Sequence, residues 1–199
     1  MGLPKRKTDF DSVEAFLAWE NAQPEKHEFV DGTVFAMVGA RRVHVTVAGN
    51  CFALLKAHLR GGPCRVFISD MKLLVAAADA VFYPDVMVTC HPEDARADAF
   101  MQHPRVLIEV LSEATAAYDR GEKFSAYRLL PDLQEYALVD PAHRTVEVFR
   151  RTDGGDWLLA LSDSANGLVL KSLDFSAPYD AVFEGLEDEQ VLPPGLPHP

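Results

Sequence analysis

The sequence predicts one domain of the α/β class, of the α+β kind, in which a mixed β-sheet is flanked by helices. Three segments carry apolar residues at helical spacing, and several short runs rich in Val, Ile, Leu and Phe alternate with turn residues. A chain of 199 residues with 48% hydrophobic residues can bury one substantial core but is short for two. We therefore expect a single domain.

The first third of the chain is predicted to fold as a helix, a hairpin and a second helix. Ser12 can cap the first helix, and Pro24 closes it. Asp31 and Gly32 form a strong hairpin turn, and Pro63 follows two glycines at the end of the second helix. The predicted elements are a helix over residues 13–21, strands over 27–30 and 33–38, and a long amphipathic helix over 43–59.

The rest of the chain is predicted to supply most of the sheet and one more helix. Its strand-like runs are rich in branched and aromatic residues, and Pro131 ends the helix. The predicted strands span 65–69, 71–76, 81–89, 106–112, 135–139, 145–150, 157–161 and 168–170, and the helix spans 119–130. The domain is expected to cover residues 8–185, and residues 186–199 to form a flexible acidic tail rich in proline.

The chain lacks the features of membrane and metal-thiolate proteins. No apolar run reaches the roughly 20 residues of a membrane span, and the polar, basic start does not resemble a signal peptide. We expect a soluble, cytoplasmic protein with no membrane partner. Cys51, Cys64 and Cys90 are odd in number and widely spaced, so they are predicted to be reduced core residues.

The formal net charge of −11 disfavours a protein that holds nucleic acid mainly by neutralising phosphates. The basic residues are concentrated near the N-terminus, however, and any polyanion would meet that half of the chain. The alternative is that these are ordinary solvated charges. They are Lys5, Arg6, Lys7, Arg41, Arg42, Lys56, Arg60 and Arg65.

Glu109 is the least expected charged residue in the sequence. It shares a face of its predicted strand with Leu107 and Leu111, and both faces of that strand are apolar. Burying an unpaired carboxylate costs several kcal/mol or more, so Glu109 needs a proton, a metal ion or a cation such as a buried arginine. Asp85 similarly follows Pro84 within the apolar run over 81–89.

Two carboxylates on neighbouring strands would suit a hard divalent cation such as Mg²⁺ or Mn²⁺. Such an ion polarises a phosphoryl oxygen and activates a bound water, and a nearby lysine can stabilise the charge that develops. Asp85 and Glu109 are therefore predicted metal ligands. Asp70 and Lys72, on a neighbouring strand, are reserve candidates.

Several of these residues together resemble the Uma-two family of endonucleases, within the restriction-endonuclease-like superfamily known by its Pro-Asp and (Asp/Glu)-x-Lys signatures. The resemblance extends over roughly residues 8–185, and it is the order and spacing of its weak motifs that make it specific. It implies a restriction-endonuclease-like fold and metal-dependent phosphodiester hydrolysis. The matching features are residues 28–32, His44, residues 83–86, residues 104–112, Asp119, Lys123, Tyr127, residues 135–136 and residues 139–141.

The chain departs from the superfamily at one position, because Leu111 stands where the signature has lysine. The family pattern places the lysine on the following helix, at Lys123. Asp119 and Tyr127 lie four residues on either side of Lys123, on the same helical face. The alternative is that Asp119 and Lys123 form a surface ion pair of little energetic value.

The resemblance also implies two residues near the start of the domain. Glu28 matches an acidic residue that could supply a metal ligand, and the alternative is a charge at a strand edge beside the Asp31 turn. His44 could help to deprotonate water, although a histidine at a helix start more often packs or caps. Ser112 has no nucleophile-elbow glycines, so a serine hydrolase is not predicted.

The sequence thus supports two hypotheses of different classes. The first is an Mg²⁺- or Mn²⁺-dependent endonuclease acting on DNA, with Asp85, Glu109 and Lys123 as catalytic residues. Glu28, His44, Asp119 and Tyr127 would support them, and Glu28 would join Asp85 and Glu109 as a metal ligand. The second is a catalytically idle nuclease fold that serves as a binding or assembly module, for instance as a homodimer formed through a sheet edge or through the helix over 43–59.

Overall fold

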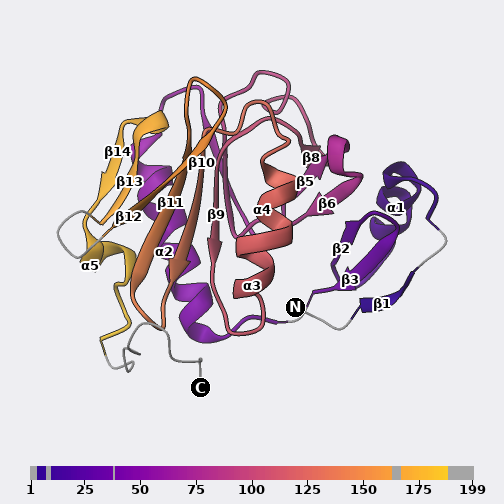
Figure 1. The fold of residues 1–199 in the computed structure, drawn as a ribbon, viewed down its shortest axis with the longest axis horizontal. Helices are drawn as coiled ribbons and strands as arrows, with labels where there is room; N and C mark the ends of the chain where they lie inside the picture. Colours follow the sequence, from indigo (N-terminus) through magenta and orange to yellow (C-terminus); the bar gives the residue numbers. More distant parts are fainter. Residues whose placement is uncertain (1–3, 8–9, 38, 163–166, 188–199) are drawn as a thin grey trace.

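The computed structural model describes residues 4–7, 10–37, 39–162 and 167–187, and only the backbone for residues 4–7. Two six-stranded sheets and a small hairpin carry the strands, and helices cover them (Figure 1). Within these ranges no helix combines the length and the apolar character that crossing a lipid bilayer requires.

The first sheet gathers most of the N-terminal strands, in the order β1-β3-β2-β6-β5-β8. The predicted helix and hairpin are present: Ser12 Oγ accepts a hydrogen bond from Ala15 N at 3.3 Å, and Asp31 and Gly32 both have positive φ, as a two-residue hairpin turn requires. The elements of this region are β1 (Pro4–Lys7), α1 (Val13–Glu20), β2 (His27–Val30), β3 (Thr33–Ala36), β5 (Lys72–Val75), β6 (Ala80–Phe82) and β8 (Phe100–Met101).

The second sheet has the order β12-β11-β10-β9-β7-β4, and its central strands β9 and β10 are parallel while the other neighbours are antiparallel. This mixture confirms the predicted mixed sheet, although the strands divide between two sheets. The members are β4 (Arg65–Ile68), β7 (Val86–Thr89), β9 (Pro104–Val110), β10 (Glu135–Asp140), β11 (Thr145–Arg151) and β12 (Trp157–Ser162). A hairpin of β13 (Leu168–Leu170) and β14 (Phe175–Ala177) and the short helix α5 (Tyr179–Val182) follow.

The single strand predicted over 81–89 is wrong. The chain leaves the first sheet after Phe82 and enters the second at Val86, so residues 83–85 belong to neither ladder. Pro84 lacks the backbone N–H that a central strand needs, which accounts for the break. Asp85 consequently lies at the junction between the two sheets.

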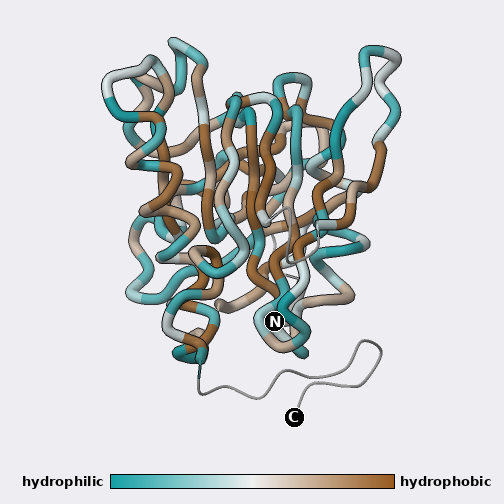
Figure 2. Tube along the Cα trace, turned by 90° about the vertical axis from the view of Figure 1, so that its left-hand side faces the viewer, coloured by the Kyte–Doolittle hydropathy of each residue, from teal (hydrophilic) through white to brown (hydrophobic). Residues whose placement is uncertain are grey.

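Helices pack on opposite faces of β9. The long helix α2 (Arg42–His58) buries Cys51 and Leu55 in the cluster that contains Ile108, whereas the later helix buries Tyr127 with Leu107 on the other face. Apolar strands accordingly run through the middle of the molecule (Figure 2). Glu109 lies on the Leu107 face, between apolar neighbours, as the alternation predicts.

The helix predicted over 119–130 is displaced and irregular. It begins three residues earlier and continues through α3 (Ala116–Tyr118), a π-helical turn η2 (Asp119–Lys123) and α4 (Phe124–Tyr127). Strands β1, β8 and β14 and helix α5 are too short to give a clear periodic pattern, and the sequence did not predict them. The predicted tail lies largely outside the described residues, which end at Glu187.

The prediction that all three cysteines are reduced is wrong for two of them. Cys64 and Cys90 form a disulfide, whereas Cys51 is free and buried in the core. Strands β4 and β7 pair antiparallel with Arg65 opposite Thr89, which brings the flanking cysteines together. A separation of 26 residues in sequence gives no sign of this register.

Candidate active site

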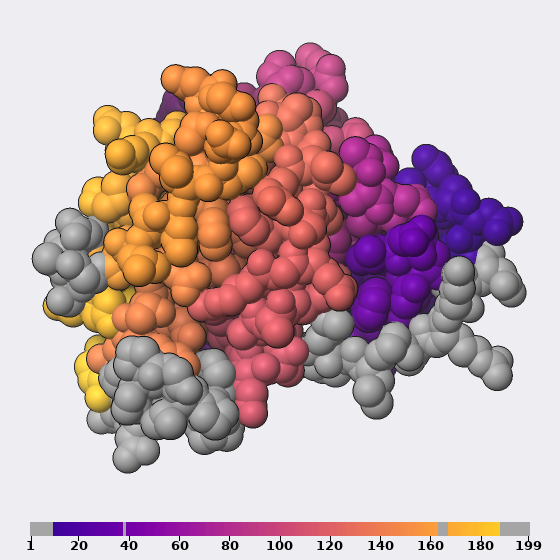
Figure 3. Space-filling view, viewed as in Figure 1, coloured from indigo at the N-terminus to yellow at the C-terminus, as the bar shows by residue number. Residues whose placement is uncertain are grey.

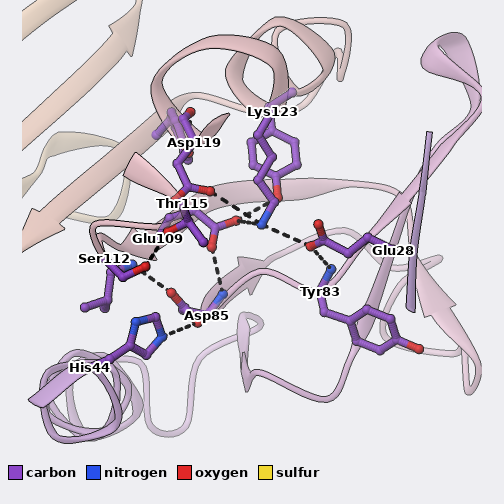
Figure 4. Close-up of polar contacts among 12 residues, drawn as sticks. Glu28, His44, Tyr83, Asp85, Glu109, Ser112, Thr115, Asp119 and Lys123 are labelled. Carbon is purple, nitrogen blue, oxygen red and sulfur yellow. Dashed lines mark hydrogen bonds and ion pairs between the residues drawn. The ribbon is translucent and has the colours of Figure 1, made fainter. Parts of the chain in front are cut away.

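One cleft of about 1370 Å³ contains six of the seven predicted site residues in its lining. The N-terminal strands border the segment of residues 110–130 here, where purple and salmon surfaces meet in Figure 3. The six side chains come from a β-strand of each sheet, the junction between the sheets, and two helices (Figure 4). They are Glu28, His44, Asp85, Glu109, Asp119 and Lys123.

Asp85 and Glu109 are neighbours because β7 and β9 are antiparallel, with Val86 opposite Ile108. Asp85 Oδ2 accepts a 2.7 Å hydrogen bond from Val110 N, and the Asp85 N–H lies 3.4 Å from Glu109 Oε2. These backbone contacts fix both carboxylates at the same end of the sheet. Asp85 retains 16% side-chain exposure to the cleft, whereas Glu109 retains only 4%.

Lys123 lies among three carboxylates. Its Nζ atom is 3.0 Å from Glu109 Oε1, 3.1 Å from Glu28 Oε1 and 3.8 Å from Asp119 Oδ1. Figure 4 shows the ammonium group between Glu28 and Glu109. Burial disfavours the charged lysine, but the carboxylates outweigh burial and hold the pKa of Lys123 well above its usual value. The surface ion pair considered for Asp119 and Lys123 is therefore wrong, since both side chains are buried.

Tyr127 does not line the cleft, but it hydrogen-bonds to Glu109 from the buried side. Its hydroxyl donates a 2.8 Å hydrogen bond to Glu109 Oε1, the oxygen that also contacts Lys123. One oxygen of Glu109 is thus bound by two protein donors, while Oε2 lies on the side of Asp85. The ring of Tyr127 is fully buried against Phe82, which limits its movement.

His44 contacts the other side of Asp85. Its Nε2 atom lies 2.9 Å from Asp85 Oδ1, and the side chain is 21% exposed. Burial lowers the pKa of His44, but the hydrogen bond and charge of Asp85 outweigh burial and raise it above 6.5. An imidazole in this position can hold or release a proton beside Asp85.

The cluster carries more negative than positive charge, which bears on whether its residues fit a metal ion. Burial, together with the neighbouring carboxylates, raises the pKa of Glu109 and of Asp119, against the lowering effect of Lys123. A divalent cation would relieve that repulsion. Asp85 and Glu109 offer oxygen donors of the kind that Mg²⁺ and Mn²⁺ prefer, so the residues fit such an ion. Glu28 contacts Lys123 and the Tyr83 N–H instead, and its part in metal binding stays a prediction.

Two of the residues considered from the sequence do not reach this cluster. Asp70 forms an ion pair with Lys26, and Lys72 donates to Asn21 at 3.1 Å. Leu111, in the position of the signature lysine, is buried in the apolar cluster of Leu107.

Sequence reasoning missed the residues that support Glu28. Tyr83 donates its backbone N–H to Glu28 Oε1 at 3.3 Å and its hydroxyl to the buried Glu20 at 2.8 Å. Glu20 also accepts from the backbone N–H of His27 at 2.9 Å. The position of Tyr83 beside Pro84 and Asp85 was the only available signal.

Comparison with known proteins assigns the chain to a family. The model of the Uma2 (Uma-two) family, described as "Putative restriction endonuclease", matches residues 13–177. The chain belongs to the Uma2 family. This family assignment confirms the resemblance stated from the sequence.

Two curated relatives of this Uma2 protein come from Synechocystis sp. (strain ATCC 27184 / PCC 6803 / Kazusa). The uncharacterized protein slr1290 is 38% identical over 175 residues, which cover 88% of this chain and 92% of the relative. The uncharacterized protein sll1609 is 34% identical over 146 residues, which cover 72% of this chain and 82% of the relative.

A solved structure shares the fold of this Uma2 protein. The crystal structure of a "putative nuclease belonging to DUF820" from Anabaena variabilis ATCC 29413 superposes with a TM-score of 0.70. The alignment covers 86% of this chain and 97% of the other at 17% identity. This likeness confirms the predicted fold class, mixed sheets flanked by helices.

Proposed function

We propose that this Uma2 protein is an endonuclease that hydrolyses phosphodiester bonds of DNA with Mg²⁺ or Mn²⁺. The observation that carries the proposal is the convergence of Asp85, Glu109 and Lys123 in one cleft, with Lys123 Nζ 3.0 Å from Glu109. Two carboxylates and a lysine are the groups that metal-assisted phosphodiester hydrolysis needs. Membership of the family supports the same reaction class.

Each residue has a distinct part in the proposed reaction. Asp85 and Glu109 would hold the ion, which when bound supplies a Lewis acid for the phosphoryl oxygen and a more acidic water. Lys123 places a positive charge where negative charge develops on the phosphate. His44, hydrogen-bonded to Asp85, can take up a proton at its ring nitrogen during attack by water.

The cleft also offers exposed cations for a polyanionic strand. Arg41 is exposed and belongs to its lining, in the N-terminal half where the sequence concentrates basic residues. Lys26 is also exposed in the lining and forms an ion pair with Asp70. Exposed cations together with a bound divalent ion would offset the acidic side chains of the lining, which include the exposed Glu25 and Glu113, and would attract phosphates to a protein of net negative charge. DNA is therefore the proposed substrate.

Nicking of supercoiled plasmid tests the proposal. The purified protein is expected to nick plasmid with Mg²⁺ or Mn²⁺ and to lose nicking in excess EDTA. Asp85→Asn, Glu109→Gln and Lys123→Ala are each expected to reduce the rate about 100-fold or more, whereas the surface variant Lys171→Ala, outside the cleft lining, should retain it. Nicking that survives all three site changes would contradict the assignment. A folded protein that never cuts with either metal would instead favour the idle binding module.

A further inference from the structure

A second group of imidazole and carboxylate side chains lies at the opposite end of β7 and β9 from the candidate active site. Asp85 precedes β7 and Glu109 is near the end of β9, whereas His91 follows β7 and His103 precedes β9. The strands are antiparallel, and their register pairs the end of β7 with the start of β9. His91 and His103 therefore meet at one edge of the sheet, and neither lines the active-site cleft.

We propose that His91, Glu93 and His103 bind a divalent transition metal ion of the zinc type. One ligand atom from each of the three lies within 4.8 Å of the others, and His103 Nε2 is 3.3 Å from Glu93 Oε2. Ligand atoms at about 2.1 Å from a tetrahedral ion lie roughly 3.4 Å apart, so this pair already has the required spacing. The two imidazole rings stack with centroids 4.0 Å apart and an interplanar angle of 24°, so the rings are already adjacent, and rotation of one ring would direct both lone pairs at a single ion.

His103 is oriented as a metal ligand by a second carboxylate. Its Nδ1 atom lies 2.8 Å from Asp132 Oδ2. A carboxylate accepts the proton of Nδ1, and in the neutral tautomer this leaves the lone pair of Nε2 directed at Glu93. A histidine that donates one nitrogen to a carboxylate while the other binds metal is a recurring feature of zinc sites. The same contact raises the basicity of the ligand nitrogen.

The loop that carries His91 and Glu93 is held against the start of β9 by other bonds. Both oxygens of the buried Asp94 accept backbone N–H groups, from Gln102 at 2.9 Å and from His103 at 3.0 Å. Thr89 Oγ1 donates to the carbonyl of His103 at 3.0 Å. These bonds hold the backbone of the ligand residues in place without the ion. Less conformational entropy is therefore lost when the ion binds.

The donor set decides the kind of ion. Two imidazole nitrogens and one carboxylate favour Zn²⁺, Ni²⁺ or Cu²⁺, whereas Mg²⁺ and Ca²⁺ prefer oxygen ligands alone. Glu93 is 65% exposed, and a cavity of about 300 Å³ opens beside both rings. Three protein ligands with an open side leave a fourth position for water. This site would thus differ in metal preference from the carboxylates of the cleft.

Titration of metal-free protein with zinc chloride, followed by calorimetry in the presence of millimolar Mg²⁺, tests this site. We expect one zinc ion per chain with a dissociation constant of about 10 µM or tighter. His103→Ala should weaken zinc binding about 100-fold, and Asp132→Asn about tenfold, the range known for loss of an orienting carboxylate. His91→Ala should weaken it as well, although less than His103→Ala. The Nδ1 atom of His91 accepts a long 3.3 Å contact from the backbone N–H of Glu93, whereas Nδ1 of His103 contacts the Asp132 carboxylate at 2.8 Å.

Three variants serve as controls for fold and location. His58→Gln removes a histidine that bonds to the Leu173 carbonyl and packs edge-to-face on Phe175, and Asp98→Asn removes an exposed carboxylate. Both should bind zinc normally, as should Glu109→Gln in the cleft. Circular dichroism and thermal unfolding would confirm that each variant is folded. The proposal would be overturned if no zinc binds at a zinc concentration of about 100 µM. It would also be overturned if zinc binding depends on Glu109 but not on the two histidines.

Discussion

The ammonium nitrogen of Lys123 lies 3.0 Å from Oε1 of Glu109, although one residue comes from a π-helical turn and the other from a β-strand. The signature position two residues after Glu109 is instead Leu111, which packs into the apolar core. The helix therefore supplies the charge that the strand lacks. Because Lys123 extends from the helical segment and not from β9 itself, it can contact Glu28 of β2 and Glu109 of β9 together.

Tyr127→Phe is predicted to weaken metal binding in the cleft. The change removes the 2.8 Å hydrogen bond to Glu109 Oε1 and leaves the ring in place. Loss of such an orienting partner typically costs about 10–100-fold in metal affinity, so the Mg²⁺ or Mn²⁺ concentration for half-maximal nicking should rise by that factor. Metal titration of the nicking rate is the measurement.

Tyr136→Phe is the matched control for this prediction. Tyr136 is equally buried and its ring packs edge-to-face with Tyr127, but its hydroxyl donates to the backbone carbonyl of Asp119 at 3.0 Å. The variant should lose about 1 kcal/mol of stability, the value of an ordinary hydrogen bond, with little change in metal affinity. Equal shifts in metal requirement for both tyrosine variants would contradict the specific role of Tyr127.

The stability of the metal-free protein is predicted to depend on pH through Glu109. Burial raises the folded-state pKa of Glu109, so the folded protein holds this proton to a higher pH than the unfolded chain does. The stabilisation from protonated Glu109 is complete below the unfolded pKa of about 4.3 and is lost as pH rises through the folded pKa. Glu109→Gln should remove the part of the fall in stability with rising pH that is due to Glu109. The free energy of unfolding of the original protein and of Glu109→Gln is measured by urea unfolding in EDTA, from about pH 4, near the unfolded pKa, upward. An identical dependence on pH in the two proteins would refute the prediction.

Counting of reactive thiols should distinguish the three cysteines. Burial, with a smaller contribution from the charge of Asp85, raises the pKa of Cys51 to about 12, so the folded protein should not react with Ellman's reagent at neutral pH. Unfolding without reductant should expose one thiol per chain, and reduction should expose three, because Cys64 and Cys90 are paired. Three thiols in the unfolded, unreduced protein would show that the pair is not oxidised.

Gly167→Ala is predicted to destabilise the fold by several kcal/mol. Gly167 has φ of +59°, and an added Cβ would lie 2.0 Å from the Ala177 carbonyl oxygen and 2.8 Å from Tyr179 N. Backbone strain alone costs about 1–2 kcal/mol, as expected for Gly155→Ala, where φ is +89° and an added Cβ would meet no described atom within 4 Å beyond its chain neighbours. The collision adds to that cost at Gly167. Urea unfolding of both variants is the measurement, and equal losses would contradict the close packing.

The burial and environment of Glu109 could be predicted because they follow from a short-range pattern. Strand alternation places Leu107 and Leu111 on its face, and the cost of burying a carboxylate requires a partner. The break at Pro84 could not be predicted in the same way. Its missing N–H was visible, but the sequence does not show that the chain passes from one sheet to another there.

The sequence by itself determined the order of the main elements, the family, and the set of side chains that carry the candidate chemistry. Periodicity, capping and turn residues act over a few positions, so they can be read directly. Tertiary structure alone decided that Lys123 pairs with Glu109, that Cys64 bonds to Cys90, and that His91 lies against His103. These pairs depend on strand register and helix placement, which result from the packing of the whole core and leave no local pattern.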